Sequence, residues 1–176
     1  MKKLLSAVFL FLFSSMLVYA QNGKIQWLSF EQAVEKGKKD PKPIIVDVYT
    51  DWCGYCKKMD KTTFQDEKIA SYINENFYAV KFNAESKQPI KFQNQTYEYV
   101  GQGKKGVHEL AYALLQGKMS YPTIVFLDEE FRLIQPIPGF MTRENLHPIL
   151  TFFEGDDYKN TPWEEYTKQY KSPYAE

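Results

Sequence analysis

Cysteine is scarce in this sequence, which holds only Cys53 and Cys56 among its 176 residues. A small protein that depended on disulfides for stability would carry several cysteines, well separated along the chain. A bridge between positions only three apart closes almost no loop, so it removes little conformational entropy from the unfolded chain. We therefore interpret the pair as chemically reactive cysteines and not as a disulfide that stabilises the fold.

An excess of charge of either sign is also missing, because 22 basic residues balance 22 acidic ones. Without a basic stripe, the sequence gives no reason to expect nucleic-acid binding. Metal ligands are few as well, since two cysteines and two histidines, distant in sequence, do not make up the four ligands of a typical zinc site. We expect neither a metal nor an organic cofactor.

Long apolar runs are absent except near the start, at Leu4–Phe13. Lys2 and Lys3 precede this run, and Val18-Tyr19-Ala20 follows it with residues that suit a cleavage site, which is typical of a signal peptide. The alternative is a membrane anchor, but the run is shorter than the roughly 20 residues that a membrane span requires. We expect residues 1–20 to be a signal peptide, and the mature chain to be soluble and periplasmic or secreted.

The rest of the sequence alternates between helical and strand patterns. Capping residues and helical spacing predict helices over 30–39, from Gly54 to about Phe64, after Asp66, over 107–115, and around 146–153, where Pro148 should kink the helix or delay its start. Apolar, β-branched runs predict strands at 44–49, 77–82, 123–127 and 131–134. Residues 84–106 look irregular, although a hairpin can form around Asn94-Gln95. This order predicts an α/β fold with a central mixed sheet flanked by helices.

The end of the chain carries a helix signature of its own. Thr161 stands three residues before Glu164, with Pro162 at the expected first helical position. Three aromatic residues then share one face of the expected helix, and we interpret this stripe as packing onto the domain rather than as a partner site: Trp163, Tyr166 and Tyr170. We therefore expect one folded domain at 21–155 and a helical C-terminal extension at 156–176.

The chemistry of thiol exchange fits Cys53 and Cys56. Exchange needs one thiolate that attacks a disulfide and a second thiol that resolves the mixed disulfide. At a strand-to-helix turn, Cys53 would sit at the helix N-terminus, where free N–H groups and the helix dipole lower a thiol pKa. Cys56, one turn on, would be more shielded. We expect Cys53 to attack and Cys56 to resolve.

Asp47 is the one acid in the apolar strand that precedes the cysteines. A buried carboxyl has a raised pKa, so Asp47 could accept the proton of Cys56 as that thiol resolves the mixed disulfide. The alternative is a buried acid whose oxygens are satisfied by backbone donors.

The cysteine pair also fits two functions other than exchange, and both fit less well. A haem attachment needs a histidine after the second cysteine, and Lys57 stands there instead. Two ordinary core cysteines at this spacing, at the end of a buried strand, remain as an alternative.

The stretch from Ile44 to Lys57 resembles thioredoxin-fold oxidoreductases in its buried acid, the Trp52 before the first cysteine, and the basic residue after the second. Tyr121-Pro122-Thr123 resembles the cis-proline segment of that family, and Gly139 a glycine near its site. The resemblance covers roughly residues 25–153. It implies that Pro122 is cis and faces Cys53, and that Trp52, Tyr121, Pro122 and Gly139 bind the substrate, with the backbone of Tyr121 offered to an extended chain.

Trp-Cys-x-x-Cys-Lys-Lys-Met and the Tyr-Pro-Thr strand entry resemble an exported thioredoxin-like subgroup. Two features depart from thioredoxin itself: the residues between the cysteines are Gly54-Tyr55, and the segment around 84–118 is longer. The direction of electron flow stays open for this reason.

A glycine-rich stretch and the two histidines do not indicate further sites. Gly101 to Gly106 spells a G-x-G-x-x-G sequence, but no strong strand precedes it, and we expect a flexible loop and not a dinucleotide site. His108 and His147 fall on expected helices, and we expect them at the surface.

The sequence thus predicts an exported protein-disulfide oxidoreductase, acting as a monomer on protein thiols and disulfides and recycled by a membrane or soluble redox partner. Two alternatives remain open. One is a dedicated reductant for a single partner, and the other is a non-catalytic binding module built on the same scaffold.

Overall fold

The computed structural model describes residues 23–103, 105–155 and 157–175. The signal peptide expected at 1–20 lies outside these residues. Among them, no helix combines the length and the apolar character that a membrane crossing requires.

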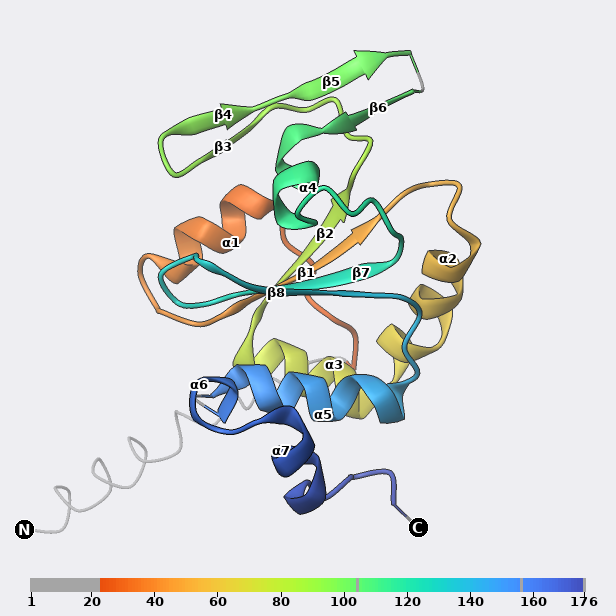
Figure 1. The fold of residues 1–176 in the computed structure, drawn as a ribbon, viewed down its shortest axis with the longest axis vertical. Coiled ribbons are helices and arrows are strands. Elements are labelled where there is room, and N and C mark those ends of the chain that lie inside the picture. Colours follow the sequence, from red (N-terminus) through yellow and green to blue (C-terminus); the bar gives the residue numbers. More distant parts are fainter. Residues whose placement is uncertain (1–22, 104, 156, 176) are drawn as a thin grey trace, which may run out of the picture.

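A four-stranded mixed sheet forms the centre of the fold, in the order β2-β1-β7-β8 (Figure 1). Its strands are β1 (Ile44–Tyr49), β2 (Tyr78–Asn83), β7 (Thr123–Leu127) and β8 (Leu133–Pro138). Strand β1 runs parallel to β2 and antiparallel to β7, and β7 runs antiparallel to β8. The expected α/β architecture with a mixed sheet is therefore confirmed.

Helices cover both faces of this sheet (Figure 1). Helices α1 (Phe30–Gly37) and α4 (Glu109–Leu114) lie on one face, and α2 (Gly54–Lys61), α3 (Glu67–Asn76) and α5 (Arg143–Glu154) on the other. Side chains alternate along β1, so Val46 and Val48 join the core under α1 and α4, while Ile45 joins the core under α2, α3 and α5. Asp47 shares the parity of Ile45 and therefore points toward the layer that contains α2.

Local capping explains where two of these helices begin. Ser29 accepts a hydrogen bond from the N–H of Gln32, and the Gln32 side chain accepts from the N–H of Ser29, which completes a capping box on α1. Asp66 caps α3 by accepting from the N–H groups of Lys68 and Ile69. These caps place the starts of both helices where the sequence predicts them, over residues 30–39 and after Asp66. Helix α2 ends at Lys61, earlier than expected, and a 3₁₀ turn at Thr63–Gln65 follows it.

The segment between β2 and α4 forms two hairpins above α1 and α4 (Figure 1). The first pairs β3 (Ile90–Phe92) with β4 (Gln95–Tyr97), at the place the sequence predicts. The second pairs β5 (Tyr99–Gln102) with β6 (Lys105–His108). The expectation of a flexible loop at Gly101–Gly106 is therefore wrong, since this stretch is a hairpin whose flanking residues pair across it.

Three other element boundaries differ from expectation. Helix α4 begins at Glu109 and not at Val107, because Val107 pairs with Val100 in the second hairpin. Strand β8 begins later than 131, because Phe131 has a φ of 64° and belongs to the turn. Helix α5 begins at Arg143, so Pro148 lies inside it and does not delay its start.

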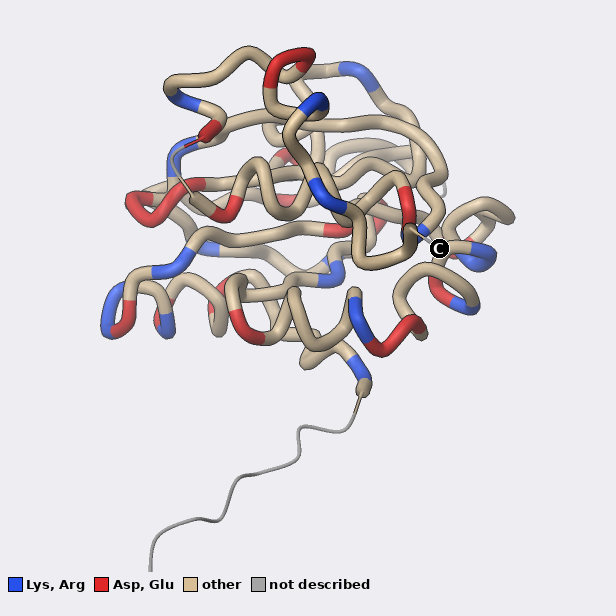
Figure 2. Tube along the Cα trace, turned by 90° about the horizontal axis from the view of Figure 1, so that it is seen from below, with Lys and Arg blue, Asp and Glu red and all other residues tan. Residues whose placement is uncertain are grey.

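The C-terminal segment contains α6 (Asp157–Asn160) and α7 (Trp163–Gln169). The expected Thr161 cap is wrong: Pro162 is the N-cap of α7, and no side chain caps this helix. The aromatic stripe packs onto α5 as predicted, with Phe152 in ring contact with Trp163 and Tyr166 at 5.1 and 4.9 Å. Along the described chain, acidic and basic residues are interspersed (Figure 2).

Candidate functional site

Cys53 and Cys56 form a disulfide at the N-terminus of α2. Cys53 is the N-cap of this helix, and its Sγ accepts the N–H of Cys56 at 3.0 Å. The turn from β1 is closed by the N–H of Cys53, which donates to the carbonyl of Thr50. The sequence prediction that the pair stands at a strand-to-helix turn is therefore confirmed, and the structure holds the oxidised form.

The two cysteines differ little in exposure. Cys53 is 5% exposed and Cys56 2%, so both are buried in the oxidised form, with Cys56 the more shielded by a small margin. Each sulfur covers part of the other once they are bonded. The exposed groups are their neighbours instead: Trp52 is 67% exposed and Tyr55 65%.

Asp47 is fully buried and bonded to Lys81, its direct partner in the register of β1 and β2. The Lys81 Nζ donates to Oδ2 of Asp47 at 2.7 Å and also to Oδ1 of Asp60 on α2. The other Asp47 oxygen, Oδ1, is buried without a hydrogen-bond partner among the described residues. The alternative of an acid satisfied by backbone donors is therefore wrong, because the one bonded oxygen is held by a lysine side chain.

Burial raises the pKa of Asp47 to about 6, against the lowering effect of the Lys81 charge. An unpartnered oxygen has the same effect, because it leaves the negative charge without full solvation. Burial lowers the pKa of Lys81, but the carboxylates of Asp47 and Asp60 outweigh it and raise that pKa above its usual value. Asp47 is thus a carboxyl that can change protonation near neutral pH while Lys81 stays charged.

Pro122 lies at the start of β7, beside the end of β1. The Tyr121–Pro122 peptide bond is cis, as the resemblance implies. The ring of Tyr121 meets the ring of Trp52 edge to face, with centroids 5.8 Å apart. Gly139, at the end of β8, donates its N–H to the carbonyl of Pro122 at 2.8 Å. The four residues expected to bind substrate are therefore joined in one chain of contacts that begins next to Cys53.

Sequence reasoning missed three residues of this site: Lys81, Asp60 and Glu85. Lys81 interrupts the apolar run of β2 as Asp47 interrupts that of β1, and two such residues on adjacent parallel strands can pair. Asp60 follows Cys56 by four positions, which places it one helical turn further along α2. Glu85 accepts a 2.9 Å hydrogen bond from Nε1 of Trp52, a contact over 33 residues that no local pattern signals.

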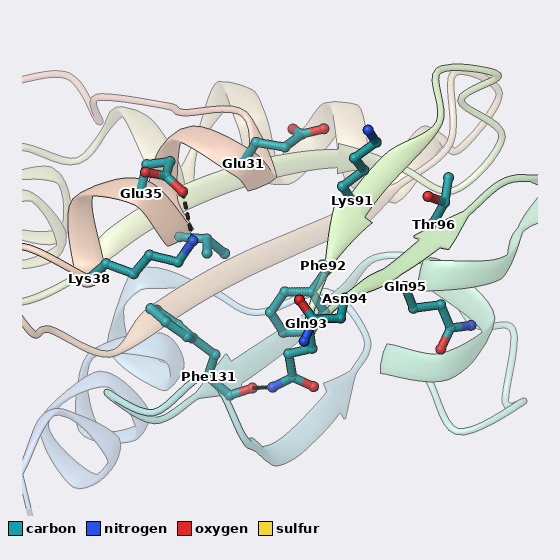
Figure 3. A pocket seen from close by; sticks show the side chains of 11 residues that line it. Glu31, Glu35, Lys38, Lys91, Phe92, Gln93, Asn94, Gln95, Thr96 and Phe131 are labelled. Atoms are coloured by element: carbon teal, nitrogen blue, oxygen red, sulfur yellow. Dashed lines mark hydrogen bonds and ion pairs between the residues drawn. The ribbon is translucent and has the colours of Figure 1, made fainter.

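A separate groove lies between α1 and the β3–β4 hairpin (Figure 3). It has a volume of about 620 Å³, with Phe92 and Phe131 among its lining residues and the Glu35–Lys38 ion pair at 2.7 Å on its rim. None of the predicted site residues lines it. Within the described ranges, no group of three His, Cys, Asp or Glu side chains is placed to hold a metal ion.

A disulfide that caps a helix, together with a cis-proline at a strand entry and a buried carboxyl on the strand before the cysteines, defines a protein-disulfide oxidoreductase of the thioredoxin fold. The sequence model of the thioredoxin-like domain matches residues 30–154. The chain belongs to this thioredoxin-like family.

Individual relatives are distant. An uncharacterized protein of Caenorhabditis elegans is 26% identical over 147 residues, covering 82% of this chain and 16% of its own length. The disulfide bond reductase DsbH of Chlamydia pneumoniae is 30% identical over 98 residues, covering 53% of this chain and 59% of its own. The chain therefore spans less than two thirds of either relative. A thioredoxin from Thermus thermophilus shares the fold with a TM-score of 0.57 at 15% identity, covering 76% of this chain and 90% of that one.

Proposed function

We propose that this protein is an exported thiol–disulfide oxidoreductase that exchanges its Cys53–Cys56 pair with protein substrates. The observation that carries the proposal is the position of Cys53 as the N-cap of α2, where its sulfur already accepts the N–H of Cys56. The same N–H and the helix dipole would stabilise a thiolate on Cys53 in the reduced form, because both favour negative charge at that point.

In the reductive direction the reaction has two steps. The Cys53 thiolate attacks one sulfur of a substrate disulfide, forming a mixed disulfide and expelling the other substrate sulfur as a thiolate. Cys56 then loses its proton and attacks the Cys53 sulfur, which closes the bond seen in the structure and releases the second substrate thiolate. The protein dithiol is oxidised and the substrate disulfide is reduced by the same electron pair, and the reverse sequence would oxidise a substrate dithiol.

Asp47 is the group proposed to accept the proton of Cys56. A base with a pKa of about 6 is ionised at neutral pH and can still hold a proton briefly, which suits proton transfer at that pH. Lys81 ties this carboxyl to Asp60 on α2, the helix that also carries Cys56. The transfer would be direct or through one water molecule.

The contacts around Pro122 support a docking role for the residues beside Cys53. An extended substrate would lie along the backbone of Tyr121 and Pro122, with Trp52 and Gly139 on either side of the contact chain. Trp52 is well suited to this role because it is exposed and yet held by both Tyr121 and Glu85.

The remaining proposals concern location and partners. The N-terminal pattern supports cleavage after Ala20 and export to the periplasm or medium, with a domain at 21–155 and the extension at 156–176. A membrane or soluble redox protein would recycle the cysteines of the monomer. The name of the DsbH relative, a disulfide bond reductase, supports the reductive direction and leaves both broad and single-partner substrate ranges open.

The decisive experiment traps the intermediate. Reduced Cys56→Ser should accumulate a mixed disulfide on Cys53 when mixed with a disulfide-bonded substrate such as insulin, whereas Cys53→Ser should trap none and lose turnover. Mass spectrometry of the adducts, with the double variant as a blank, gives the attachment site. Adducts on Cys56 would reverse the two roles, and absence of insulin turnover by the wild type would favour a dedicated reductant or a binding module.

A further inference from the structure

A cleft begins at the residue before Cys53 and is closed by the segment inserted between β2 and α4. It has a volume of about 490 Å³, and six of the residues that line it are Asp51, Trp52, Asn83, Glu85, Lys87 and Tyr99. Trp52 and Asp51 come from the turn that carries Cys53, whereas Tyr99 comes from the second hairpin. A chain bound at the disulfide would therefore pass this cleft within a residue or two of its own cysteine.

The two carboxylates in this cleft, Asp51 and Glu85, have no ion-pair partner among the described residues. Glu85 binds the indole N–H of Trp52 through Oε1, and no ion pair within the described part of the chain neutralises it. The Asp51 carboxylate is exposed and likewise has no hydrogen bond or ion pair among the described residues. The Glu85 charge also reaches Tyr121, where burial first and this carboxylate second raise the pKa of the phenol to about 12. Glu85 thus acts on the surface where the proposed substrate lies, and Asp51 lines the same cleft.

The one lysine among those six residues, Lys87, contacts an aromatic ring and not a carboxylate. The Lys87 Nζ lies over the ring of Tyr99, 5.7 Å from its centroid. This contact shows that the aromatic wall of the cleft accepts an ammonium group, and it also leaves the two carboxylates without a basic partner among these six residues. The exposed Trp52 ring and the two carboxylates without an ion-pair partner together favour a cationic side chain, through cation–π contact and charge attraction.

We propose that this cleft is a specificity site that favours disulfide substrates with a lysine or arginine next to the attacked cysteine. The proposal rests on the proposed exchange at Cys53. It assigns Asp51 and Glu85 the role of charge selection and Trp52 and Tyr99 that of apolar walls. The segment inserted between β2 and α4 then contributes to substrate selection, because it supplies Glu85 and Tyr99, which the cysteine turn itself does not carry.

The test compares three disulfide-linked peptides that differ only in the residue after the cysteine: lysine, alanine or glutamate. The second-order rate constant for reduction by the reduced full-length protein should rank lysine above alanine above glutamate. Exposed charge pairs are weak, so we expect about two- to fivefold per step at low salt, shrinking toward equal rates at about 1 M salt.

Variants then locate the effect. Glu85→Gln keeps an acceptor for the Trp52 N–H but removes the charge, so together with Asp51→Asn it should abolish the ranking of the three peptides. Lys87→Met should increase the differences between the rate constants of the three peptides, because it removes the positive charge from the cleft. Glu164→Gln on α7 removes one negative charge, as Glu85→Gln alone does, and should leave the ranking of the three peptides unchanged. Equal rates for all peptides, or a ranking that survives the Asp51→Asn/Glu85→Gln double variant, would overturn the specificity site. Failure of every peptide to react would instead contradict the proposed exchange.

Discussion

The ammonium group of Lys81 lies 2.7 Å from Oδ2 of Asp47, and this contact does not bring the Asp47 pKa down to its ordinary value. Because strand β1 is covered on both faces, the desolvation cost of the Asp47 carboxylate exceeds its favourable interaction with one lysine. Lys81 also divides its charge between Asp47 and Asp60. The folded protein therefore disfavours the ionised form of Asp47, and a raised pKa of this kind is expected of a functional acid.

Asp47→Asn should make the oxidised protein more stable at pH 8. A pKa of about 6 against an ordinary 3.8 corresponds to about 3 kcal/mol lost when Asp47 ionises in the folded chain. Losing one partner of Lys81 offsets part of this, so we expect a net gain of about 1–2 kcal/mol in urea unfolding. Asp51→Asn, at an exposed acid, should change stability by less than about 0.5 kcal/mol. A destabilised Asp47→Asn would mean that the ion pair outweighs burial.

The pH dependence of this gain has a definite sign. Because the folded pKa of Asp47 is raised, its contribution to stability is complete below about pH 4 and is lost as the pH rises through about 6. The stability difference between Asp47→Asn and wild type should therefore grow from pH 4 to pH 6 and be constant above. Unfolding free energies measured at intervals of half a pH unit give this curve, and a difference that shrinks over the same range would contradict the raised pKa.

Asp47→Asn should also slow the resolving step. Removing a general base typically costs a hundredfold or more, so we expect release of the mixed disulfide to slow by at least about tenfold at pH 7. In the wild type this rate should rise with ionisation of a group near pH 6. In Asp47→Asn it should rise only near the ordinary thiol pKa of about 8.5. Quenched-flow analysis of the mixed disulfide separates this step from the attack by Cys53.

The elements nearest the cysteines were predictable because their signals are local. The run Ile44–Tyr49 is apolar and β-branched over most of its length, and it forms β1 with the same bounds. Ser29 and Asp66 are side chains that satisfy N–H groups two or three residues away, so the sequence alone places them. The Cys53–Cys56 spacing likewise fixes a bonded pair on one helical turn.

Contacts across long sequence separations were not predictable in this way. His108 and His147 were expected at the surface, and both are buried. His108 is buried because the hairpin before it and the loop at Gln88 close over it, and its Nε2 meets the Gln88 carbonyl at 3.0 Å. His147 is covered by the C-terminal tail, where the Tyr170 hydroxyl lies 2.7 Å from its Nδ1. Each burial depends on a segment about 20 residues away.

His108 should hold the inserted segment against the domain. Its Nδ1 accepts the N–H of Leu110, and its Nε2 therefore carries the proton that bonds the Gln88 carbonyl. His108→Phe loses both bonds and should cost about 2–4 kcal/mol. His108→Asn can still cap the Leu110 N–H, so it should cost clearly less. Equal losses in urea unfolding would show that ring volume and not hydrogen bonding is what matters here.

Protonation of His108 should have the same consequence as its loss. Burial lowers its pKa, so its contribution to stability is complete above about pH 6.5 and declines as the pH falls toward the lowered value. His147 has a pKa lowered by burial as well, and it contributes in the same direction. The difference in unfolding free energy between wild type and His108→Phe isolates the His108 part, and it should narrow below pH 6. A difference independent of pH would contradict this protonation effect.

Gly139 should resist substitution for a backbone reason. Its φ of 106° lies in the region that side chains rarely adopt, and a Cβ there would meet no atom within 4 Å. Gly139→Ala should therefore cost about 1–2 kcal/mol through strain alone, and move the N–H that bonds Pro122. Gly155→Ala is the matched control, because its surroundings are equally open and its φ is −109°. Thermal unfolding of both variants measures this cost, and equal melting temperatures for Gly139→Ala and Gly155→Ala would exclude strain at Gly139.

The C-terminal tail should stabilise the domain through Tyr174. Its hydroxyl donates to Oδ1 of Asp66 at 2.6 Å, the same oxygen that caps α3. Burial raises the pKa of Asp66, but bonds from Tyr174, Ile69 and Arg143 outweigh it and hold the pKa below its ordinary value.

Tyr174→Phe should therefore cost about 1 kcal/mol at pH 7, and less once the pH falls through the lowered pKa of Asp66 and its carboxylate loses its charge. Tyr112→Phe is the control, since the Tyr112 ring is 56% exposed and its hydroxyl has no hydrogen bond among the described residues. Insulin reduction should stay within about twofold of wild type in both variants, because the tail packs on α3 and α5 and not on the cysteine turn. A loss of exchange with unchanged stability would instead tie the tail to the redox site.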